Sequence, residues 1–251
     1  MKEHSKILLF DIETFPTLGY FWSHPWETSI ISIKEDWYML SFAYKWLGEK
    51  TVHVCSLPDF KTYKKDKKDD KELCKMLWKL LDEAEVICGH NALSFDCKKA
   101  NARFIAHEFL TPKPYKIIDT KIEAKKYFNF TSNKLDDLGQ YLNLGKKIQT
   151  GGFDLWKKCS EGDEQAWQLM EKYNRQDVIL LEKIYMKMQG WMTTHPNMNL
   201  INDTTDGCPN CGSKDLHKRG FATTRVAKFQ RWQCQKCGAW SRSPLKGGIV
   251  R

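Results

Sequence analysis

A strongly apolar run that ends in two alternating carboxylates is the feature that most constrains this chain. The run Ile7–Phe10 is typical of a buried strand, and Asp11 and Glu13 follow it directly. Side chains at positions i and i+2 of a strand point to the same face, so the two carboxylates should converge. Because like charges repel at short range, we expect a cation between them. Ligand sets made only of oxygen suit Mg²⁺ or Mn²⁺.

A second polar pair lies on the apolar stripe of a predicted helix. From Glu164 to Gly190, apolar residues recur at helical steps of three and four. Tyr173 and Asp177 lie on that stripe at i and i+4. A core arginine or a helix cap could explain Asp177 alone. Because an unpaired buried carboxylate is costly, its coincidence with the strand pair favours a shared metal site.

A third segment contributes Asp96. Residues 85–89 predict a short strand and 92–109 a helix, with Asp96 in the first two turns. The helix dipole favours a negative charge there, which explains Asp96 by itself. Gly89 permits a tight turn, and His90 and Asn91 offer hydrogen-bonding groups at the end of the strand.

Together the three segments resemble the DEDD superfamily of 3′→5′ exonucleases, also called DnaQ-like, which has a ribonuclease H-like fold. Residues 10–14 (Phe-Asp-Ile-Glu-Thr) match its first motif, and 89–91 (Gly-His-Asn) with 95–96 (Phe-Asp) its second. Residues 173–177 (Tyr-x-x-x-Asp) match the third motif, and the tyrosine indicates the subgroup with Tyr in that motif. The resemblance covers roughly residues 5–195, and no motif residue is missing.

The resemblance implies a metal-dependent phosphodiester hydrolase that binds two Mg²⁺ (or Mn²⁺) ions. Asp11 would bridge the ions, and Glu13 and Asp177 would complete the first site. Asp96 would help to hold the second ion, largely through water. Tyr173 would orient the attacking water rather than act as a strong base. These five residues are the candidate catalytic set.

Two further positions are assigned to substrate by the resemblance. Thr14 and Asn91 would contact the last nucleotide. Asp119 follows another apolar strand and precedes a helical stretch from Thr120 to Tyr127. It is better explained as the N-cap of that helix than as a metal ligand.

Two Cys-x-x-Cys knuckles lie near the other end of the chain. Cys208 and Cys211 form the first, and Cys234 and Cys237 the second. Four thiolates at this spacing predict one tetrahedral structural Zn²⁺, with a disulfide pair as the alternative. The other five cysteines are scattered as free core thiols would be: Cys55, Cys74, Cys88, Cys97 and Cys159.

The spacer between the knuckles alternates basic and aromatic residues, which suits a phosphate backbone and stacked bases. It resembles the zinc ribbons of transposases and transcription factors, some of which bind proteins, so a protein partner is the alternative. The candidate nucleic-acid contacts are Arg219, Arg225, Lys228, Arg231 and Trp232.

Net charge favours nucleic acid. The chain has 40 Lys and Arg against 31 Asp and Glu, a formal net charge of +9. Ten of the basic residues and one acidic residue lie from Cys208 onward, which leaves thirty of each before it. A solvated basic face is the ordinary explanation for such a cluster. Its concentration beside a predicted nuclease favours contact with phosphates.

The predicted fold class is α/β: a ribonuclease H-like, mixed five-stranded sheet with flanking helices, plus a small zinc-ribbon domain. We predict a nuclease domain at 1–195, a linker at 196–206 and the ribbon with its basic tail at 207–251. The aromatic stretch 15–37 either stacks a terminal base or covers the core. Residues 146–152 are interpreted as a connecting loop, with a basic loop near the substrate as the alternative.

We therefore expect a two-metal-ion 3′→5′ exonuclease that releases nucleoside monophosphates from single-stranded DNA ends. The alternatives are a 3′→5′ exoribonuclease and a nucleic-acid or transcription-associated binding module on a ribonuclease H-like scaffold. A scaffold has no reason to keep a repulsive buried cluster, which argues against the last. With no secretory signal and no apolar run of membrane length, we expect no membrane partner and a reducing compartment: the cytoplasm, or the host cytoplasm if the chain is virus-encoded.

Overall fold

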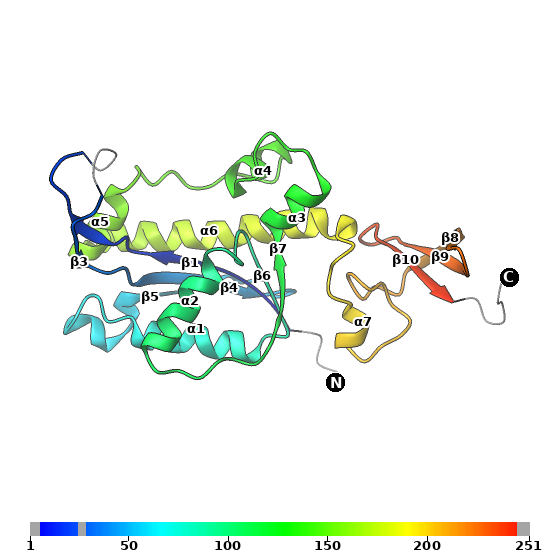
Figure 1. Cartoon of the computed structure of the whole chain (residues 1–251), viewed down its shortest axis with the longest axis horizontal. Coiled ribbons are helices and arrows are strands. Elements are labelled where there is room, and N and C mark those ends of the chain that lie inside the picture. The colour runs from blue at the N-terminus through cyan, green and yellow to red at the C-terminus, as the bar shows by residue number, and fades with distance from the viewer. Residues whose placement is uncertain (1–5, 25–28, 245–251) are drawn as a thin grey trace.

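The computed structural model describes residues 6–24 and 29–244 (Figure 1). Its centre is a mixed five-stranded sheet with the order β5-β4-β1-β6-β7. β1 pairs antiparallel with β4 and parallel with β6, and β6 pairs parallel with β7. The predicted mixed five-stranded sheet is thereby confirmed. The strands are β1 (Ile7–Thr14), β4 (Met39–Trp46), β5 (His53–Ser56), β6 (Val86–Gly89) and β7 (Lys116–Asp119).

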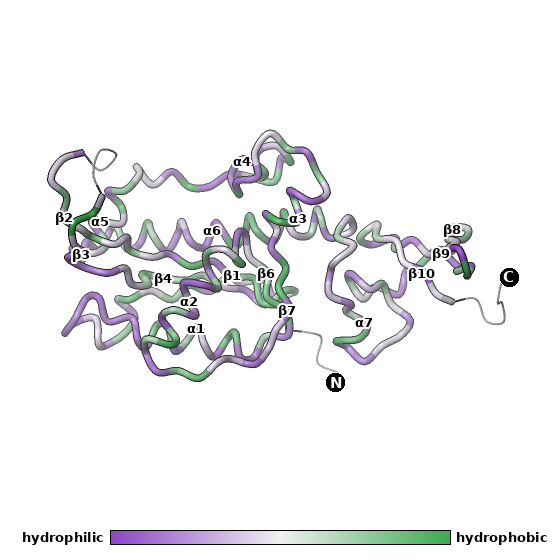
Figure 2. Tube along the Cα trace, viewed as in Figure 1, coloured by the Kyte–Doolittle hydropathy of each residue, from purple (hydrophilic) through white to green (hydrophobic). Residues whose placement is uncertain are grey.

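Helices cover both faces of this sheet (Figures 1 and 2). α1 (Lys71–Glu83) and α2 (Asp96–Ala106) bury their apolar residues with Leu8, Phe10 and Ile12 of β1. The opposite face, with Ile7 and Leu9, packs against the remaining helices. These are α3 (Thr120–Tyr127), α4 (Leu135–Tyr141) and the long α6 (Glu164–Met188). α5 (Asp154–Glu161) contacts α6.

The pleat of β1 decides where its carboxylates point. Residues 7–10 are at most 3% exposed, as expected of a strand buried on both faces. Because successive side chains alternate, Asp11 and Glu13 share the face of Ile7 and Leu9, which is the face covered by α6. Asp163 caps α6 by accepting a 2.8 Å hydrogen bond from the Ala166 amide.

The turn after β6 differs from the prediction. The helix expected from residue 92 begins at Asp96, because residues 91–95 form a separate turn. Asp119 holds this turn: its Oδ1 accepts from the Asn91 amide (2.9 Å) and its Oδ2 from the Leu93 amide (3.1 Å). Its Oδ1 also caps α3, accepting from the amides of residues 121 and 122, which confirms the predicted N-cap. At Gly89, a Cβ would lie 2.6 Å from the Cβ of Ala92, so the tight turn requires glycine.

The aromatic stretch after β1 forms a small hairpin that the sequence did not predict. β2 (Leu18–Tyr20) pairs with β3 (Ser32–Glu35), and residues 25–28 lie outside the described chain. Trp22 is 88% exposed, so it does not cover the core. Phe15, which is buried and stacked on Tyr38, does cover it.

The C-terminal segment forms a second, three-stranded sheet with the order β10-β9-β8. Its strands are β8 (Leu216–Thr223), β9 (Lys228–Cys234) and β10 (Trp240–Pro244). The preceding segment contains a short helix, α7 (Met198–Ile201). No helix in the described part of the chain is long and apolar enough to cross a lipid bilayer.

This small sheet is docked on the end of α6 through a buried amide pair. Asn210 Nδ2 donates to the carbonyls of Gln189 (2.7 Å) and Met192 (3.0 Å). Gln189 Nε2 donates in return to the Asn210 carbonyl (3.0 Å). At Gly190, a Cβ would lie 1.9 Å from the Cys237 carbonyl oxygen, so the two backbones pack directly against each other and leave no room for a side chain. The two sheets are therefore joined by a specific interface as well as by the chain.

We predict that Asn210→Ala lowers the free energy of unfolding by about 1–3 kcal/mol, because two buried carbonyls lose their donor. Urea titration monitored by tryptophan fluorescence would measure it. The exposed Gln235, in the turn that follows β9, provides the control: Gln235→Ala should change stability by less than about 0.5 kcal/mol. Equal effects of the two changes would mean that the amide pair does not hold the interface.

Candidate active site

Three carboxylates meet where β1 faces the middle of α6. One oxygen from each of Asp11, Glu13 and Asp177 lies within 4.8 Å of the others. The strand supplies the first two and the helix the third. Asp177 is 1% exposed. The convergence predicted from the strand and helix periodicities is therefore observed.

Asp96 joins the same end of β1 from another direction. It is the first residue of α2 and 2% exposed. β1 pairs with β6 only as far as Leu9, so the Ile12 amide is free to donate to Asp96 Oδ1 (3.1 Å). The carboxylate oxygens of Asp96 do not lie within 4.8 Å of all three of the other carboxylates. Its negative charge still raises the pKa of Asp11.

Burial raises the pKa of every member of this cluster, and repulsion between members raises it further for Asp11 and Glu13. For Asp11, burial is the larger cause, followed by Asp177, Asp96 and Glu13. Burial and then Asp177 raise the pKa of Glu13 to about 8, against the opposing effect of Lys147. Burial raises the pKa of Asp96 to about 7 and that of Asp177 to about 6. Without a cation these carboxyl groups therefore retain protons near neutral pH, and a bound cation would favour their ionised form.

Lys147 is the only described cation with an ion pair to this cluster. Its Nζ lies 2.6 Å from Asp177 Oδ2 and donates to the Tyr173 hydroxyl at 2.8 Å. Although burial opposes it, the charge of Asp177 raises the pKa of Lys147 overall, so the ammonium stays protonated. Its loop therefore lies at the site, which corrects its interpretation as a plain connection. The adjacent lysines and glycines were the available sequence signal.

Tyr173 borders the cluster one helical turn before Asp177. Burial and the charge of Asp177 raise the pKa of its phenol, which therefore stays neutral at physiological pH. The Trp156 ring of α5 packs edge-on against it, with the centroids 5.9 Å apart. A neutral, fixed phenol can orient a water molecule but is a poor base.

Asn174 is a site residue to which the sequence gave no role. It is fully buried, and its Nδ2 donates to the Asp11 carbonyl (3.2 Å) and to Asp11 Oδ2 (2.9 Å). Its Oδ1 accepts from Ser41 Oγ (3.1 Å). Asn174 thus fixes the rotamer of Asp11. Its position three residues before Asp177, on the same helical face, was the available signal.

The two predicted nucleotide contacts lie on different segments. Thr14 ends β1, beside an irregularity in the pairing with β4. Asn91 has a left-handed backbone (φ 71°), and its Oδ1 accepts from Lys121 Nζ (3.2 Å). Their contact with a nucleotide stays a prediction.

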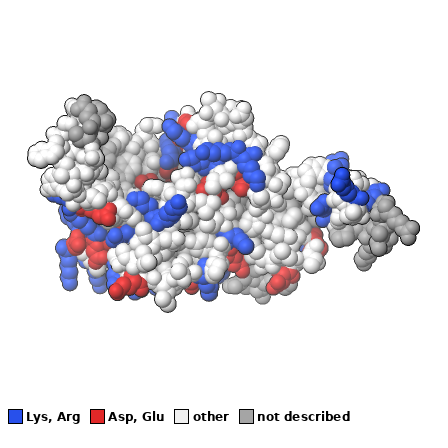
Figure 3. Space-filling model, in the orientation of Figure 1, with Lys and Arg blue, Asp and Glu red and all other residues white. Residues whose placement is uncertain are grey.

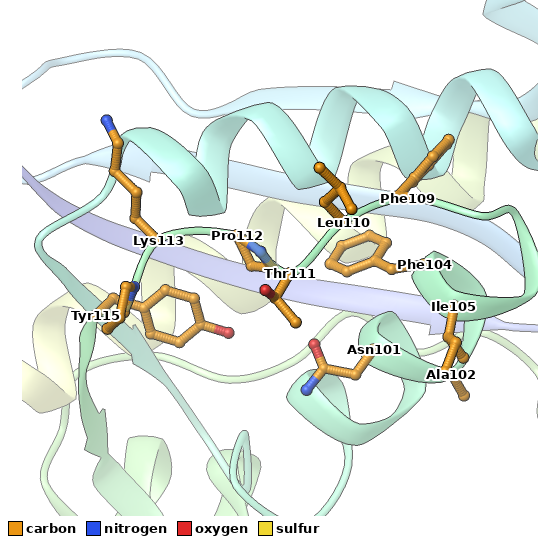
Figure 4. A pocket seen from close by; sticks show the side chains of 11 residues that line it. Asn101, Ala102, Phe104, Ile105, Phe109, Leu110, Thr111, Pro112, Lys113 and Tyr115 are labelled. Carbon is orange, nitrogen blue, oxygen red and sulfur yellow. The ribbon is translucent and has the colours of Figure 1, made fainter.

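The carboxylate cluster fits divalent cations. Both oxygens of Asp177 are buried without a hydrogen bond of normal geometry. Carboxylate oxygens are the ligands that Mg²⁺ and Mn²⁺ prefer, and one ammonium cannot neutralise four carboxylates. A surface groove of about 800 Å³ lies elsewhere, between the end of α2 and the segment before β7 (Figure 4). Its lining includes Phe104, Leu110 and Tyr115 but no carboxylate, so it offers no such chemistry.

The four knuckle cysteines also converge. Their Sγ atoms lie within 4.8 Å of one another, with Cys208–Cys237 and Cys211–Cys234 both at 3.6 Å. Disulfide sulfurs lie about 2.05 Å apart, so the disulfide alternative does not describe this cluster. A tetrahedral ion with Zn–S bonds of about 2.3 Å requires sulfurs about 3.8 Å apart. The geometry is therefore compatible with Zn²⁺.

The basic and aromatic candidates of the small sheet do not share one face. Arg231 and Trp232 are consecutive in β9 and so point to opposite sides. Arg219, Arg225 and Lys228 are exposed, with Arg225 in the loop between β8 and β9. Figure 3 shows Lys and Arg gathered on this part of the molecule.

Comparison with known proteins supports the ribonuclease H-like fold. A family model described as the RNase_H superfamily matches residues 27–189. The match includes Asp96, Tyr173 and Asp177 but begins after Asp11 and Glu13. The structure is similar to that of a family B DNA polymerase from the hyperthermophilic archaeon Pyrobaculum calidifontis, with a TM-score of 0.56 and 13% identity. The similarity covers 89% of this chain and 32% of the polymerase, so this chain spans about a third of its length. No curated protein matches the chain.

We predict that the metal-free protein loses stability as the pH rises from about 6.5 to about 8. Glu13 has an ordinary pKa near 4.5 when unfolded and one of about 8 when folded, so the folded state binds more protons in this window. Burial lowers the pKa of His90 from an ordinary value of 6.5 to about 4, so His90 opposes this slope only at the lower end of the window, where the unfolded chain still binds part of its proton. Chemical denaturation in EDTA at several pH values would measure the slope.

Two variants make this pH experiment specific. Glu13→Gln should flatten the slope, whereas Glu72→Gln, which removes an exposed carboxylate, should leave it unchanged. Mg²⁺ should restore stability at pH 8 in the wild type. A slope that is identical in all three proteins would show that the cluster carries no buried charge.

We also predict that Cys211→Ser removes bound zinc and unfolds the small sheet while the central sheet persists, because the stability of so small a domain comes from its metal. Zinc content by atomic absorption and exchange protection of the amides in β8–β10 would measure this. Cys55→Ser is the control and should retain both. Full protection in a zinc-free protein would contradict the prediction.

Proposed function

Because the chain belongs to the RNase H superfamily, we propose that it is a two-metal-ion 3′→5′ exonuclease that releases nucleoside monophosphates from single-stranded DNA ends. The observation that supports this most directly is the cluster of half-buried Asp11 and Glu13 with buried Asp177, and with Asp96 beside it. A cluster that raises the pKa of its own members needs cations, and phosphodiesters are substrates that such cations bind.

In this proposal Asp11, Glu13 and Asp177 would hold one divalent ion, and Asp11 with Asp96 would hold the other. When bound, Mg²⁺ or Mn²⁺ acidifies water and neutralises the charge that develops on the departing 3′ oxygen. Asn174 keeps Asp11 in one orientation through its 2.9 Å hydrogen bond.

Tyr173 positions the attacking water with its neutral hydroxyl, which Lys147 holds at 2.8 Å. Lys147 also neutralises part of the charge of Asp177. The side chains of Thr14 and Asn91 contact the terminal nucleotide, since they lie at the ends of β1 and β6 where the carboxylates converge.

The division of the chain supports a second contact with nucleic acid. We assign residues 1–195 to the nuclease domain, 196–206 to the linker and 207–251 to a zinc ribbon with one structural Zn²⁺. The ribbon and its tail carry the whole net positive charge of the chain. DNA is the first substrate to test, because the similar solved structure is that of a DNA polymerase. An exoribonuclease and a protein-binding ribbon are the alternatives.

We predict that Asp11→Asn and Asp177→Asn abolish cleavage, whereas Tyr173→Phe reduces the rate on the order of 10²-fold, because it only loosens the water. Single-stranded DNA, duplex DNA and RNA labelled at the 5′ end, incubated with Mg²⁺, should give ladders that shorten from the 3′ end. EDTA should stop the reaction.

Glu72→Gln, which removes an exposed carboxylate outside the site, should cleave as the wild type does. A ladder obtained with RNA alone would select the exoribonuclease. Near wild-type turnover of either aspartate variant would exclude the two-metal-ion proposal.

A further inference from the structure

Two arginines lie directly opposite each other on the three-stranded sheet. In the antiparallel pairing of β9 with β10, Arg231 is the partner of Arg242. Directly opposite residues share a face, with their Cβ atoms about 5 Å apart, and like charges there are destabilising. Both side chains are exposed. The pairing therefore brings two positive charges together on one side of the sheet.

No acidic side chain in the described ranges forms an ion pair with either arginine. The only acidic residue from Cys208 onward is Asp215, which lies 3.6 Å from His217. Among the residues that the structure describes, no acidic group thus compensates the charge repulsion between the arginines. An anion bound between them would remove it.

Aromatic rings hold the two guanidinium groups in place. Arg231 lies over the ring of Trp240, 5.0 Å from its centroid, and Arg242 over Phe229 at 4.6 Å. Both rings share the face of the arginines, since 229 and 231 alternate along β9, as do 240 and 242 along β10. Stacked guanidinium groups lose less entropy on binding, and their fork of donors matches phosphate oxygens. Trp240 is 52% exposed, which leaves a ring edge beside this site.

The opposite face has a different arrangement of charge. Lys218 is opposite Trp232, and Lys228 is opposite Thr223, so each lysine has a neutral partner across the strands. The Trp232 indole donates to Ser243 Oγ at 2.9 Å. Lys218 and Lys228 carry the same total charge as Arg231 and Arg242 but are not paired with each other across the strands. They therefore provide a matched control for the arginine pair.

The docking on α6 fixes how far this surface lies from the carboxylates. Asp177 and Met188 are eleven residues apart on one helix, which corresponds to roughly 17 Å at 1.5 Å per residue. The amide pair between Gln189 and Asn210 then attaches the small sheet. A stacked strand advances about 3.4 Å per nucleotide, so roughly five or more nucleotides separate the two places.

We propose that the face of β9 and β10 that carries Arg231 and Arg242 binds the phosphate backbone of a single-stranded nucleic acid whose 3′ end lies at the carboxylates. The identity of the bound end rests on the proposed function. The arginine pair is the phosphate clamp. The lysine face contributes only long-range attraction, so in this inference Lys228 and Trp232, predicted from the sequence as nucleic-acid contacts, do not touch the strand.

The test compares two double variants of equal charge in an Asp177→Asn background, which prevents degradation. Arg231→Ala with Arg242→Ala should weaken binding of a single-stranded oligonucleotide of about 20 nucleotides by about tenfold or more. The slope of log K against log salt should fall by roughly 1.4, since each lost contact with a single strand contributes about 0.7. Lys218→Ala with Lys228→Ala should change both quantities much less. Fluorescence anisotropy would measure them, and zinc content would verify that both ribbons are folded.

A trinucleotide, too short to reach both places, should bind the two double variants equally. Equal losses in both variants with the long oligonucleotide would overturn the inference and leave a diffuse basic surface. Unchanged binding in both would also overturn it and leave the ribbon as a protein-docking module. Neither result depends on cleavage, which the wild type reports separately in the ladder assay.

Discussion

Repulsion between the carboxylates of β1 and α6 is the constraint on which the site depends. Burial raises the pKa of Asp11, Glu13 and Asp177, and the neighbouring carboxylates raise it further for Asp11 and Glu13. Such an arrangement is unfavourable to folding, and it persists because β1 and the inner face of α6 are packed into the apolar core. The free energy gained by burying the apolar core thus offsets the cost of bringing these carboxyl groups together.

The residues around the cluster limit the cost of this repulsion. Asn174 donates to Asp11, the Ile12 amide donates to Asp96, and Lys147 pairs with Asp177. Each contact fixes a carboxylate in one orientation while leaving oxygens for other ligands. Preorganisation of this kind is what catalysis by positioned groups requires, because the geometry is then set before the substrate arrives.

The long helix α6 connects the two parts of the molecule. Its middle carries Tyr173 and Asp177, and its end meets the small sheet through Gln189 and Asn210 (Figure 1). A flexible tether would leave the basic ribbon at a variable distance from the carboxylates. The docked ribbon has one position instead, so a nucleic acid that contacts both places must have a defined minimum length.

Local sequence patterns determined the five-stranded sheet, the convergence of Asp11 with Glu13, the cap at Asp119 and the clustering of the four cysteines. The reason is that strand and helix periods, together with motif spacing, fix which side chains share a face. Only the tertiary structure placed Asn174 on Asp11 and Lys147 on Asp177. Those contacts join residues far apart in the chain, and no local period predicts them. The strand register likewise decided that Arg231 lies opposite Arg242 and not opposite Ser241, since pairing between strands depends on the turn that joins them.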